Sequence, residues 1–142
     1  MINKEHEFAI LSLGGAINAK RQQELQQFGA LKLQVSAIVD SEKSSLGSAI
    51  AKQRKDFQSV CSKLGIRCHI LERRAIENYF SLRAIRAALG KHHSRGLQPY
   101  ESLTAVPHHW PKRDNWKIAR ATNWSEIEQT DLGEWLIELK KN

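Results

Sequence analysis

The sequence predicts an α/β domain built on a parallel sheet, and three short apolar runs are the main evidence for it. These runs cover residues 8–13, 35–39 and 67–71. Each is of strand length and is bounded by glycine, polar or charged residues, as buried strands are. Helix-like segments separate the runs. The resulting order of strand, helix, strand, helix, strand is typical of a parallel sheet covered by helices.

The segments between the runs read as helices because of their periodicity and their stop signals. Gly14 and Gly15 close the first run, and a polar, glutamine-rich helix over residues 18–27 follows, with Gly29 as its end. The clearest helix is predicted over residues 46–64. Its apolar face is formed by Leu46, Ile50, Phe57, Val60, Cys61 and Leu64, and Gly65 ends it.

The second half of the chain is predicted to be less regular. Residues 76–89 read as a helix ending at Gly90, and residues 91–114 contain all three prolines and read as a loop. Short helical turns follow, and a last helix carries the apolar stripe Leu132, Trp135, Leu136 and Leu139. We therefore expect an α/β core over residues 1–90, with a basic loop and C-terminal helices over 91–142 packed on the same domain.

Charge is concentrated in one part of the sequence. The formal net charge is +7, and residues 83–120 hold eight basic and two acidic side chains, while residues 121–142 are net −3. A basic cluster with aromatic residues is typical of proteins that bind a phosphate backbone. Trp110 and Trp116 lie in this basic part and are candidates for nucleic-acid contact, whereas Trp124 and Trp135 are expected in the core. Charge alone does not separate DNA, RNA and an acidic protein as partners.

Several classes of protein are excluded by composition. No apolar run approaches the roughly 20 residues that cross a bilayer, and the N-terminus has no apolar signal region, so we expect a cytoplasmic protein without a membrane partner. Cys61 and Cys68 are too few for a disulfide framework and are expected as buried thiols. The pairs His92–His93 and His108–His109 lie in the predicted loop and lack zinc-type spacing to the cysteines.

Carboxylates follow two neighbouring predicted strands. Asp40 and Glu42 come directly after residues 35–39, and Glu77 follows the third strand, with Arg73 and Arg74 between. Because ligands bind at the carboxyl ends of parallel strands, these oxygens could hold a hard cation such as Mg²⁺, and the arginines a phosphate. The alternative is structural: Asp40 and Glu42 would cap the next helix, and Glu77 would stabilise the first turn of its own.

The motifs "AIVDSE" and "ILERRAIENYF" resemble the Toprim domain at the C-terminal end of OLD-family ATP-dependent nucleases and related ATPases. In that family an acidic D-x-D motif ends one strand, and a phrase close to L-x-R-x-x-I-E-N-Y follows the next. The segments "LSLGGAIN" and "WKIARATNWSEIEQTDLGEWLIEL" resemble its glycine-containing strand end and its closing helices. The order of the motifs extends the resemblance from about Phe8 to Leu139.

The resemblance implies a nuclease that hydrolyses the DNA phosphodiester with Mg²⁺ or Mn²⁺. Asp40 matches the first carboxylate of the family motif, Glu42 stands in place of the usual second aspartate, and Glu77 matches the glutamate of I-E-N-Y as a supporting metal ligand. A late lysine assists at the phosphate in the family, and either Lys112 or Lys117 could match it. Contacts to nucleic acid are expected from Arg73, Arg74, Lys91, Arg95, Lys112, Arg113 and Lys117.

The sequence also departs from the family pattern. A Toprim domain opens with a strand that ends in a catalytic glutamate, whereas only seven residues precede Phe8, and there is no P-loop motif of an ATPase. The sequence therefore corresponds to the later part of such a domain. Two alternatives follow: a catalytically inactive remnant that binds nucleic acid or an ATPase partner, and an interaction module that uses the acidic C-terminal helix. A missing first strand would leave a sheet edge open to a partner strand or a homodimer.

Overall fold

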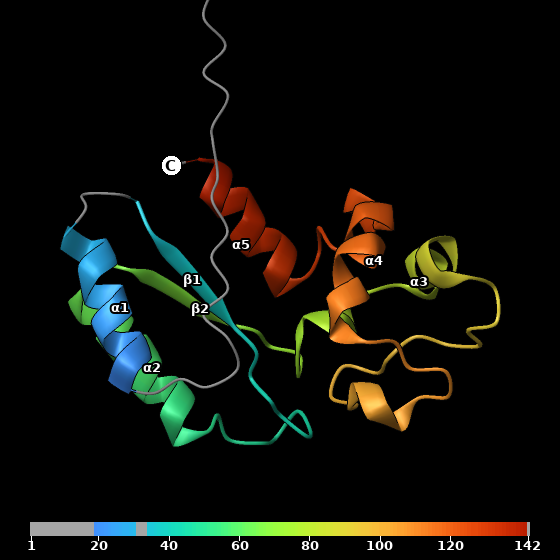
Figure 1. Cartoon of the computed structure of the whole chain (residues 1–142), viewed down its shortest axis with the longest axis horizontal. Helices are drawn as coiled ribbons and strands as arrows, with labels where there is room; N and C mark the ends of the chain where they lie inside the picture. The colour runs from blue at the N-terminus through green and yellow to red at the C-terminus, as the bar shows by residue number, and fades with distance from the viewer. Residues whose placement is uncertain (1–18, 31–33, 142) are drawn as a thin grey trace, which may run out of the picture.

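A computed structural model describes residues 19–30 and 34–141, and within them the fold is mixed α/β (Figure 1). The longer elements are α1 (Ala19–Ala30), β1 (Ser36–Val39), α2 (Lys52–Lys63), β2 (Arg67–Ile70), α3 (Leu82–Leu89), α4 (Asn115–Ala121) and α5 (Asp131–Lys140). Four short 3₁₀ helices join them: η1 (Ile76–Tyr79), η2 (Leu103–Ala105), η3 (Lys112–Asp114) and η4 (Trp124–Glu126). The predicted first strand, residues 8–13, lies outside the described residues.

The strands β1 and β2 pair in parallel, as the sequence predicts. Ser36 is opposite Arg67 and Val39 is opposite Ile70, and the described part of the chain contributes only these two strands to the sheet. Residues on the two faces of β1 alternate, as in any strand. Ala37 and Val39 pack with α1 and α2, while Ile38 packs with α5, so helices cover both faces (Figure 1).

The helix predicted over residues 46–64 begins later than the pattern indicates. It starts at Lys52, and Leu46, which was expected on its apolar face, is 79% exposed. The backbone amide of Ser45 donates to the Ser48 hydroxyl at 3.0 Å, and the Ser44 and Ser48 hydroxyls are 3.1 Å apart. Serine side chains that bond to nearby backbone groups compete with the helix, which explains the later start.

The helix predicted over residues 76–89 is divided in two. The turn η1 ends at Tyr79, and α3 begins at Leu82 after the extended residue Phe80. Ser81 causes the division, because its hydroxyl accepts a hydrogen bond from the Ala84 amide at 3.0 Å and so caps a new helix. Helix α3 then ends at Gly90, as predicted, with φ of 113° at the glycine.

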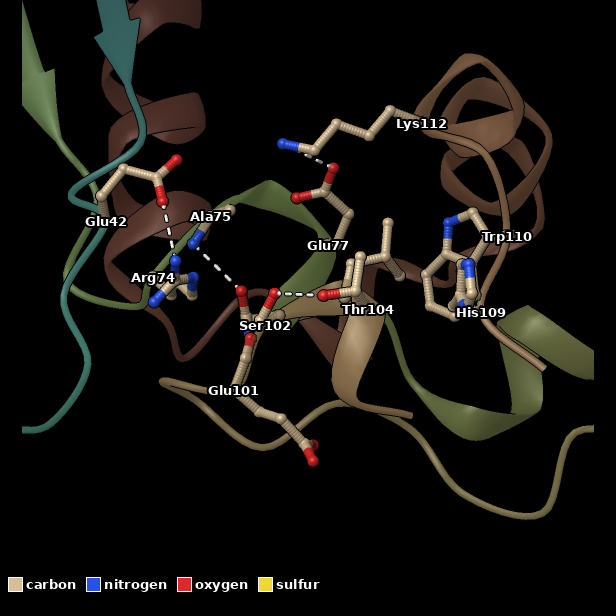
Figure 2. A pocket seen from close by; sticks show the side chains of 12 residues that line it. Glu42, Arg74, Ala75, Glu77, Glu101, Ser102, Thr104, His109, Trp110 and Lys112 are labelled. Carbon is tan, nitrogen blue, oxygen red and sulfur yellow. Dashed lines mark hydrogen bonds and ion pairs between the residues drawn. The ribbon is translucent and has the colours of Figure 1, made fainter. Parts of the chain in front are cut away.

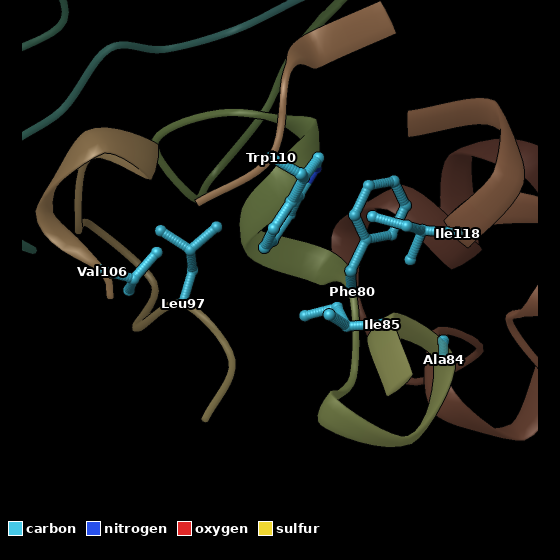
Figure 3. Packing of buried hydrophobic residues seen from close by; sticks show 7 residues of the cluster. All are labelled: Phe80, Ala84, Ile85, Leu97, Val106, Trp110 and Ile118. Carbon is cyan, nitrogen blue, oxygen red and sulfur yellow. The ribbon is translucent and has the colours of Figure 1, made fainter. Parts of the chain in front are cut away.

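A second hydrophobic cluster lies between α3, α4 and the loop of residues 91–114 (Figure 3). It contains Phe80, Ala84, Ile85, Leu97, Val106, Trp110 and Ile118. Trp110 is only 4% exposed, and its indole N–H donates to Asn115 Oδ1 at 2.9 Å. The prediction that Trp110 contacts nucleic acid is therefore wrong, because its ring is committed to this core.

The other predicted core residues differ among themselves. Trp124 is 42% exposed, contrary to prediction, because it lies in the short turn η4 rather than on the apolar face of a helix. Trp135 is half-buried and stacks on His69 with ring centroids 6.1 Å apart. Cys61 is fully buried, as expected, while Cys68 is half-buried. None of the helices in the described part of the chain is long and apolar enough to span a bilayer.

Candidate functional site

The loops that follow β1 and β2 are joined by hydrogen bonds at one end of the sheet. The Ser41 hydroxyl donates to the carbonyl of Arg73 at 2.7 Å, and the Glu42 amide donates to the carbonyl of Arg74 at 2.9 Å. Parallel strands send both loops out at this end. These two hydrogen bonds therefore hold Asp40 and Glu42, which follow β1, beside the turn η1 that follows β2.

Asp40 is held by the turn that follows the neighbouring strand. Its Oδ1 accepts a hydrogen bond from the backbone amide of Ile76 at 3.1 Å. The alternative in which Asp40 caps the next helix along the chain does not hold, because α2 starts at Lys52 and Ala51 is its N-cap residue. Asp40 instead ties the loop after β1 to the first residue of η1.

One lysine, Lys112, reaches two carboxylates here, and Figure 2 shows its contact with Glu77. The Lys112 Nζ atom lies 3.4 Å from Glu77 Oε1 and 4.0 Å from Asp40 Oδ2. Glu77 is 1% exposed, and Asn115 Nδ2 donates to its Oε1 at 2.9 Å. The Lys112 side chain is 61% exposed, so it approaches the carboxylates from the solvent side.

The two acids influence each other electrostatically. Burial is the main reason that the pKa of Asp40 is raised above its ordinary value, and the negative charge of Glu77 raises it further. The Ile76 amide and the Lys112 ammonium act in the opposite direction but do not cancel the effect. Asp40 and Glu77 thus share one cation, and their combined negative charge is only partly compensated.

Glu42 makes a separate ion pair with Arg74, at the edge of a pocket that Glu77 and Lys112 also line. Its Oε2 lies 3.2 Å from Arg74 Nη2, and its backbone has φ of 57°. Glu42, Arg74, Glu77 and Lys112 line a hollow of about 270 Å³, shown in Figure 2, that the loop around residues 101–104 closes from the other side. Four predicted site residues, Glu42, Arg74, Glu77 and Lys112, therefore line one pocket.

The remaining predicted residues lie elsewhere or have structural partners. Arg73 donates to the carbonyl of Asn78 at 2.7 Å and lies over the Tyr79 ring at 4.7 Å, so it stiffens the η1 turn. Arg95 makes two hydrogen bonds to the carboxylate of Glu101, at 2.6 and 2.7 Å. Lys91 and Arg113 are exposed at the surface.

The geometry separates the two late lysines that the sequence left open. Lys112 contacts the acidic pair, whereas Lys117 Nζ lies 2.9 Å from Asp114 Oδ1 and 5.9 Å from the centre of the Trp116 ring. Lys117 is directed to solvent on α4. Only Lys112 is brought to the carboxylates.

A second polar network, which was not predicted, joins β2, η1 and the start of α5. Asp131 accepts hydrogen bonds from the Tyr79 hydroxyl at 2.6 Å and the Glu72 amide at 2.9 Å, and it lies 2.8 Å from His69 Nε2. Burial alone would raise the pKa of Asp131, but these hydrogen bonds outweigh burial and hold the pKa below its ordinary value. No sequence signal pairs Asp131 with residues more than fifty positions earlier.

The predicted loop histidines form a cluster. The His92 ring lies 4.2 Å from that of His93 and 5.5 Å from that of His108, measured between centroids. Burial, together with the charges of the neighbouring histidines and Arg86, lowers the pKa of His93. Across residues 19–30 and 34–141, no group of three or more histidine, cysteine or acidic side chains is arranged to hold a metal ion.

No protein-family model, curated protein or solved structure matches this chain. The Toprim resemblance therefore rests on the sequence motifs and their order.

Proposed function

We propose that this chain is a Toprim-like nuclease domain that hydrolyses phosphodiester bonds in DNA with Mg²⁺ or Mn²⁺. The observation that carries the proposal is the position of Lys112, whose ammonium group lies between Asp40 and Glu77. A cation already fits between two carboxylates beside the ends of two parallel strands, which is where open α/β sheets bind ligands. The motifs "AIVDSE" and "ILERRAIENYF" supply these same two carboxylates.

The donor set suits a hard divalent cation. Mg²⁺ is usually held by one or two carboxylates, with water and substrate phosphate completing its coordination. Asp40 and Glu77 would provide the carboxylates, and Glu42, which lines the same pocket as Glu77, could provide a third by leaving Arg74. When bound, the metal would supply polarisation of the phosphodiester and activation of water.

The basic side chains have separate roles in this proposal. Lys112 is long and 61% exposed, so it can leave the carboxylates and neutralise a phosphate oxygen. Arg74 lines the pocket and pairs with Glu42 at 3.2 Å, so its planar pair of donors would become available to the next phosphate once Glu42 turns to the metal. Arg73 and Arg95 act on the protein itself, because their guanidinium groups are already paired with η1 and Glu101.

A second candidate function has its own supporting observation. Lys112 neutralises part of the acidic pair, and the described residues hold no group of three metal-ligating side chains. A domain in which this lysine replaces the metal would be catalytically inactive. It would bind nucleic acid or an ATPase partner through its basic surface.

The test is metal-dependent nicking of supercoiled DNA, together with direct Mn²⁺ binding. We expect the wild-type chain to nick DNA with Mg²⁺ or Mn²⁺ and to stop when the metal is chelated. Asp40→Asn should lose the cleavage and weaken Mn²⁺ binding, as followed by the paramagnetic signal of the free ion. Asp56→Asn is the matched control, since Asp56 is an exposed acid that pairs with Lys52 on α2.

The two candidates give different results in this experiment. If neither metal supports nicking and Mn²⁺ binds wild type and Asp40→Asn equally, the nuclease proposal is lost. DNA binding that persists unchanged in Asp40→Asn would then favour the inactive binding domain.

A further inference from the structure

Two tryptophans on the surface share the same local arrangement. Trp116 is 60% exposed and Trp124 is 42% exposed. Each has a lysine amine 5.9 Å from its ring centre, Lys117 for Trp116 and Lys140 for Trp124. Nucleic-acid bases stack on exposed aromatic rings of this kind, and neighbouring cations add to the attraction. The pair allows one ring to serve as a control for the other.

The surroundings of the two rings differ in charge. Arg113, Trp116, Lys117 and Arg120 recur at positions i, i+3, i+4 and i+7, so they lie on one face of η3 and α4, and all are exposed. Ile118, on the opposite side of α4, is fully buried in the core. Trp124 instead belongs to residues 121–142, which carry a net charge of −3.

The cations around Trp116 are available to a ligand. Among the described residues, the side chains of Arg113 and Arg120 have no hydrogen bond or ion pair. Lys117 is paired with Asp114 at 2.9 Å but keeps a 44% exposed side chain. Free arginines beside an open aromatic ring are the combination that binds a nucleic-acid backbone and stacks a base.

We propose that this face of η3 and α4, formed by Arg113, Trp116, Lys117 and Arg120, binds an unpaired DNA strand. One base stacks on the Trp116 ring, and the arginines and Lys117 contact the phosphates on either side. A base can stack on a protein ring only when it is not covered by its own duplex neighbours, so the surface selects single strands. The charge of the surface fits the phosphates, and it does not fit an apolar or basic partner.

The surface also adjoins the proposed catalytic site. Lys112 and Asn115 precede Trp116 in the chain, and both contact Glu77, at 3.4 and 2.9 Å. A strand held on Trp116 would therefore continue toward the carboxylate pocket. The inference rests on the proposed function only in naming DNA, because base stacking requires no metal.

The test is binding of a labelled oligothymidine in the presence of a metal chelator, measured by fluorescence anisotropy. Trp116→Leu should weaken binding by about tenfold, the loss expected for one stacked base, and Trp116→Phe should restore most of it. Trp124→Leu should bind as wild type does. A DNA duplex should bind wild type and Trp116→Leu alike.

Salt dependence separates the stacked ring from the phosphate contacts. Trp116→Leu should leave the slope of affinity against salt unchanged, whereas Arg113→Gln and Arg120→Gln should each make it shallower, because fewer counterions are released. Circular dichroism checks that each variant is folded. The arginine variants test the same surface even if a tryptophan variant does not fold.

Other outcomes overturn the proposal. Oligothymidine binding by Trp116→Leu equal to wild type would do so, as would equal losses in Trp116→Leu and Trp124→Leu. Tighter binding of oligouridine than of oligothymidine would make RNA the ligand. If Trp116→Leu changes only the sedimentation of the protein, the surface is a contact between copies of the chain. Binding is measured without metal, so its failure and the failure of Asp40-dependent cleavage are independent results.

Discussion

Asp40 and Asp131 both bind the chain segment that follows β2, but their surroundings shift their pKa values in opposite directions. Each accepts a backbone amide from the segment after β2, Ile76 for Asp40 and Glu72 for Asp131. Asp131 gains two further side-chain partners, His69 and Tyr79, whereas Asp40 faces the negative charge of Glu77. As a result the pKa of Asp131 is lowered and that of Asp40 is raised.

The difference indicates that the region around Asp131 stabilises the fold, whereas the region around Asp40 is suited to bind a ligand. A buried carboxylate with all its partners supplied by the protein stiffens the fold, whereas one with too few partners favours an added cation or proton. Asp131 fixes Tyr79 at the end of η1, and η1 carries Glu77. The hydrogen bonds of Asp131 therefore help to hold Glu77 in place beside Asp40.

The largest effect is expected from Gly133→Ala, which disturbs the Asp131 region without removing a hydrogen-bonding group. A methyl group at this position would overlap with the carbonyl oxygen of Ile127 and lie 2.8 Å from the Glu128 Cα atom. Both are backbone atoms, so α5 must move, and we expect the free energy of unfolding to fall by about 3 kcal/mol. Gly47→Ala, with nothing within 4 Å, should leave the urea midpoint unchanged. Equal midpoints for the two variants would show that α5 is not closely packed.

The direct comparison is Asp131→Asn against Asp40→Asn. In Asp131→Asn, an amide NH₂ group would face groups that donate hydrogen bonds to Asp131. We expect the free energy of unfolding in urea to fall by about 2 kcal/mol. The second removes a charge that burial and Glu77 disfavour, so we expect stability within about 0.5 kcal/mol of wild type or above it. Equal losses in the two variants would contradict the division between a structural and a poised carboxylate.

A smaller effect is expected from Lys112→Met, which leaves Glu77 without its cation. Glu77 is 1% exposed, but Lys112 is largely in solvent, so we expect a loss of about 1 kcal/mol rather than the full cost of a buried pair. Adding Glu77→Gln to Lys112→Met should recover part of the loss in a double-mutant cycle. Additive losses would mean that the two side chains do not interact.

The smallest effect is expected in the dependence of stability on pH. Because the folded pKa of Asp40 is raised above its ordinary 3.8, its ionisation destabilises the fold, and this penalty disappears as pH falls through the folded pKa. The folded pKa of Asp131 is lowered, so its stabilisation is complete above 3.8 and is lost as pH falls below that value. We would measure the free energy of unfolding of wild type, Asp40→Asn and Asp131→Asn in urea at decreasing pH. The stability of Asp40→Asn relative to wild type should fall at a higher pH than the one at which the deficit of Asp131→Asn begins to shrink. If the stability deficit of Asp131→Asn instead shrinks at the higher pH of the two, the directions assigned to the pKa values of Asp40 and Asp131 are wrong.

Local patterns in the sequence predicted the parallel strands and the helix end at Gly90. The apolar runs at 35–39 and 67–71 are β1 and β2, because hydrophobic residues in a short run between helices have few other ways to be buried. The nearness of Asp40 and Glu77 also follows from the sequence, since parallel strands end on the same side. The Toprim identity of the fold remains a prediction.

What the sequence did not predict depends on contacts between distant residues. Trp110 is flanked by polar and basic residues, yet it is buried because the loop folds back onto α3 and α4. Asp131 follows an N-cap threonine and reads as a helix-start residue, although it also joins β2 and η1. The late start of α2 comes from serine hydrogen bonds that periodicity does not register.

The left-handed backbone at Glu42 has a consequence for how this sequence can diverge. Aspartate adopts a positive φ more readily than glutamate does, but it is one methylene too short to keep the 3.2 Å contact with Arg74. Backbone preference and ion pairing therefore favour different residues at position 42. In related sequences, we expect positions 42 and 74 to covary, with a shorter acid at 42 wherever the arginine at 74 is lost.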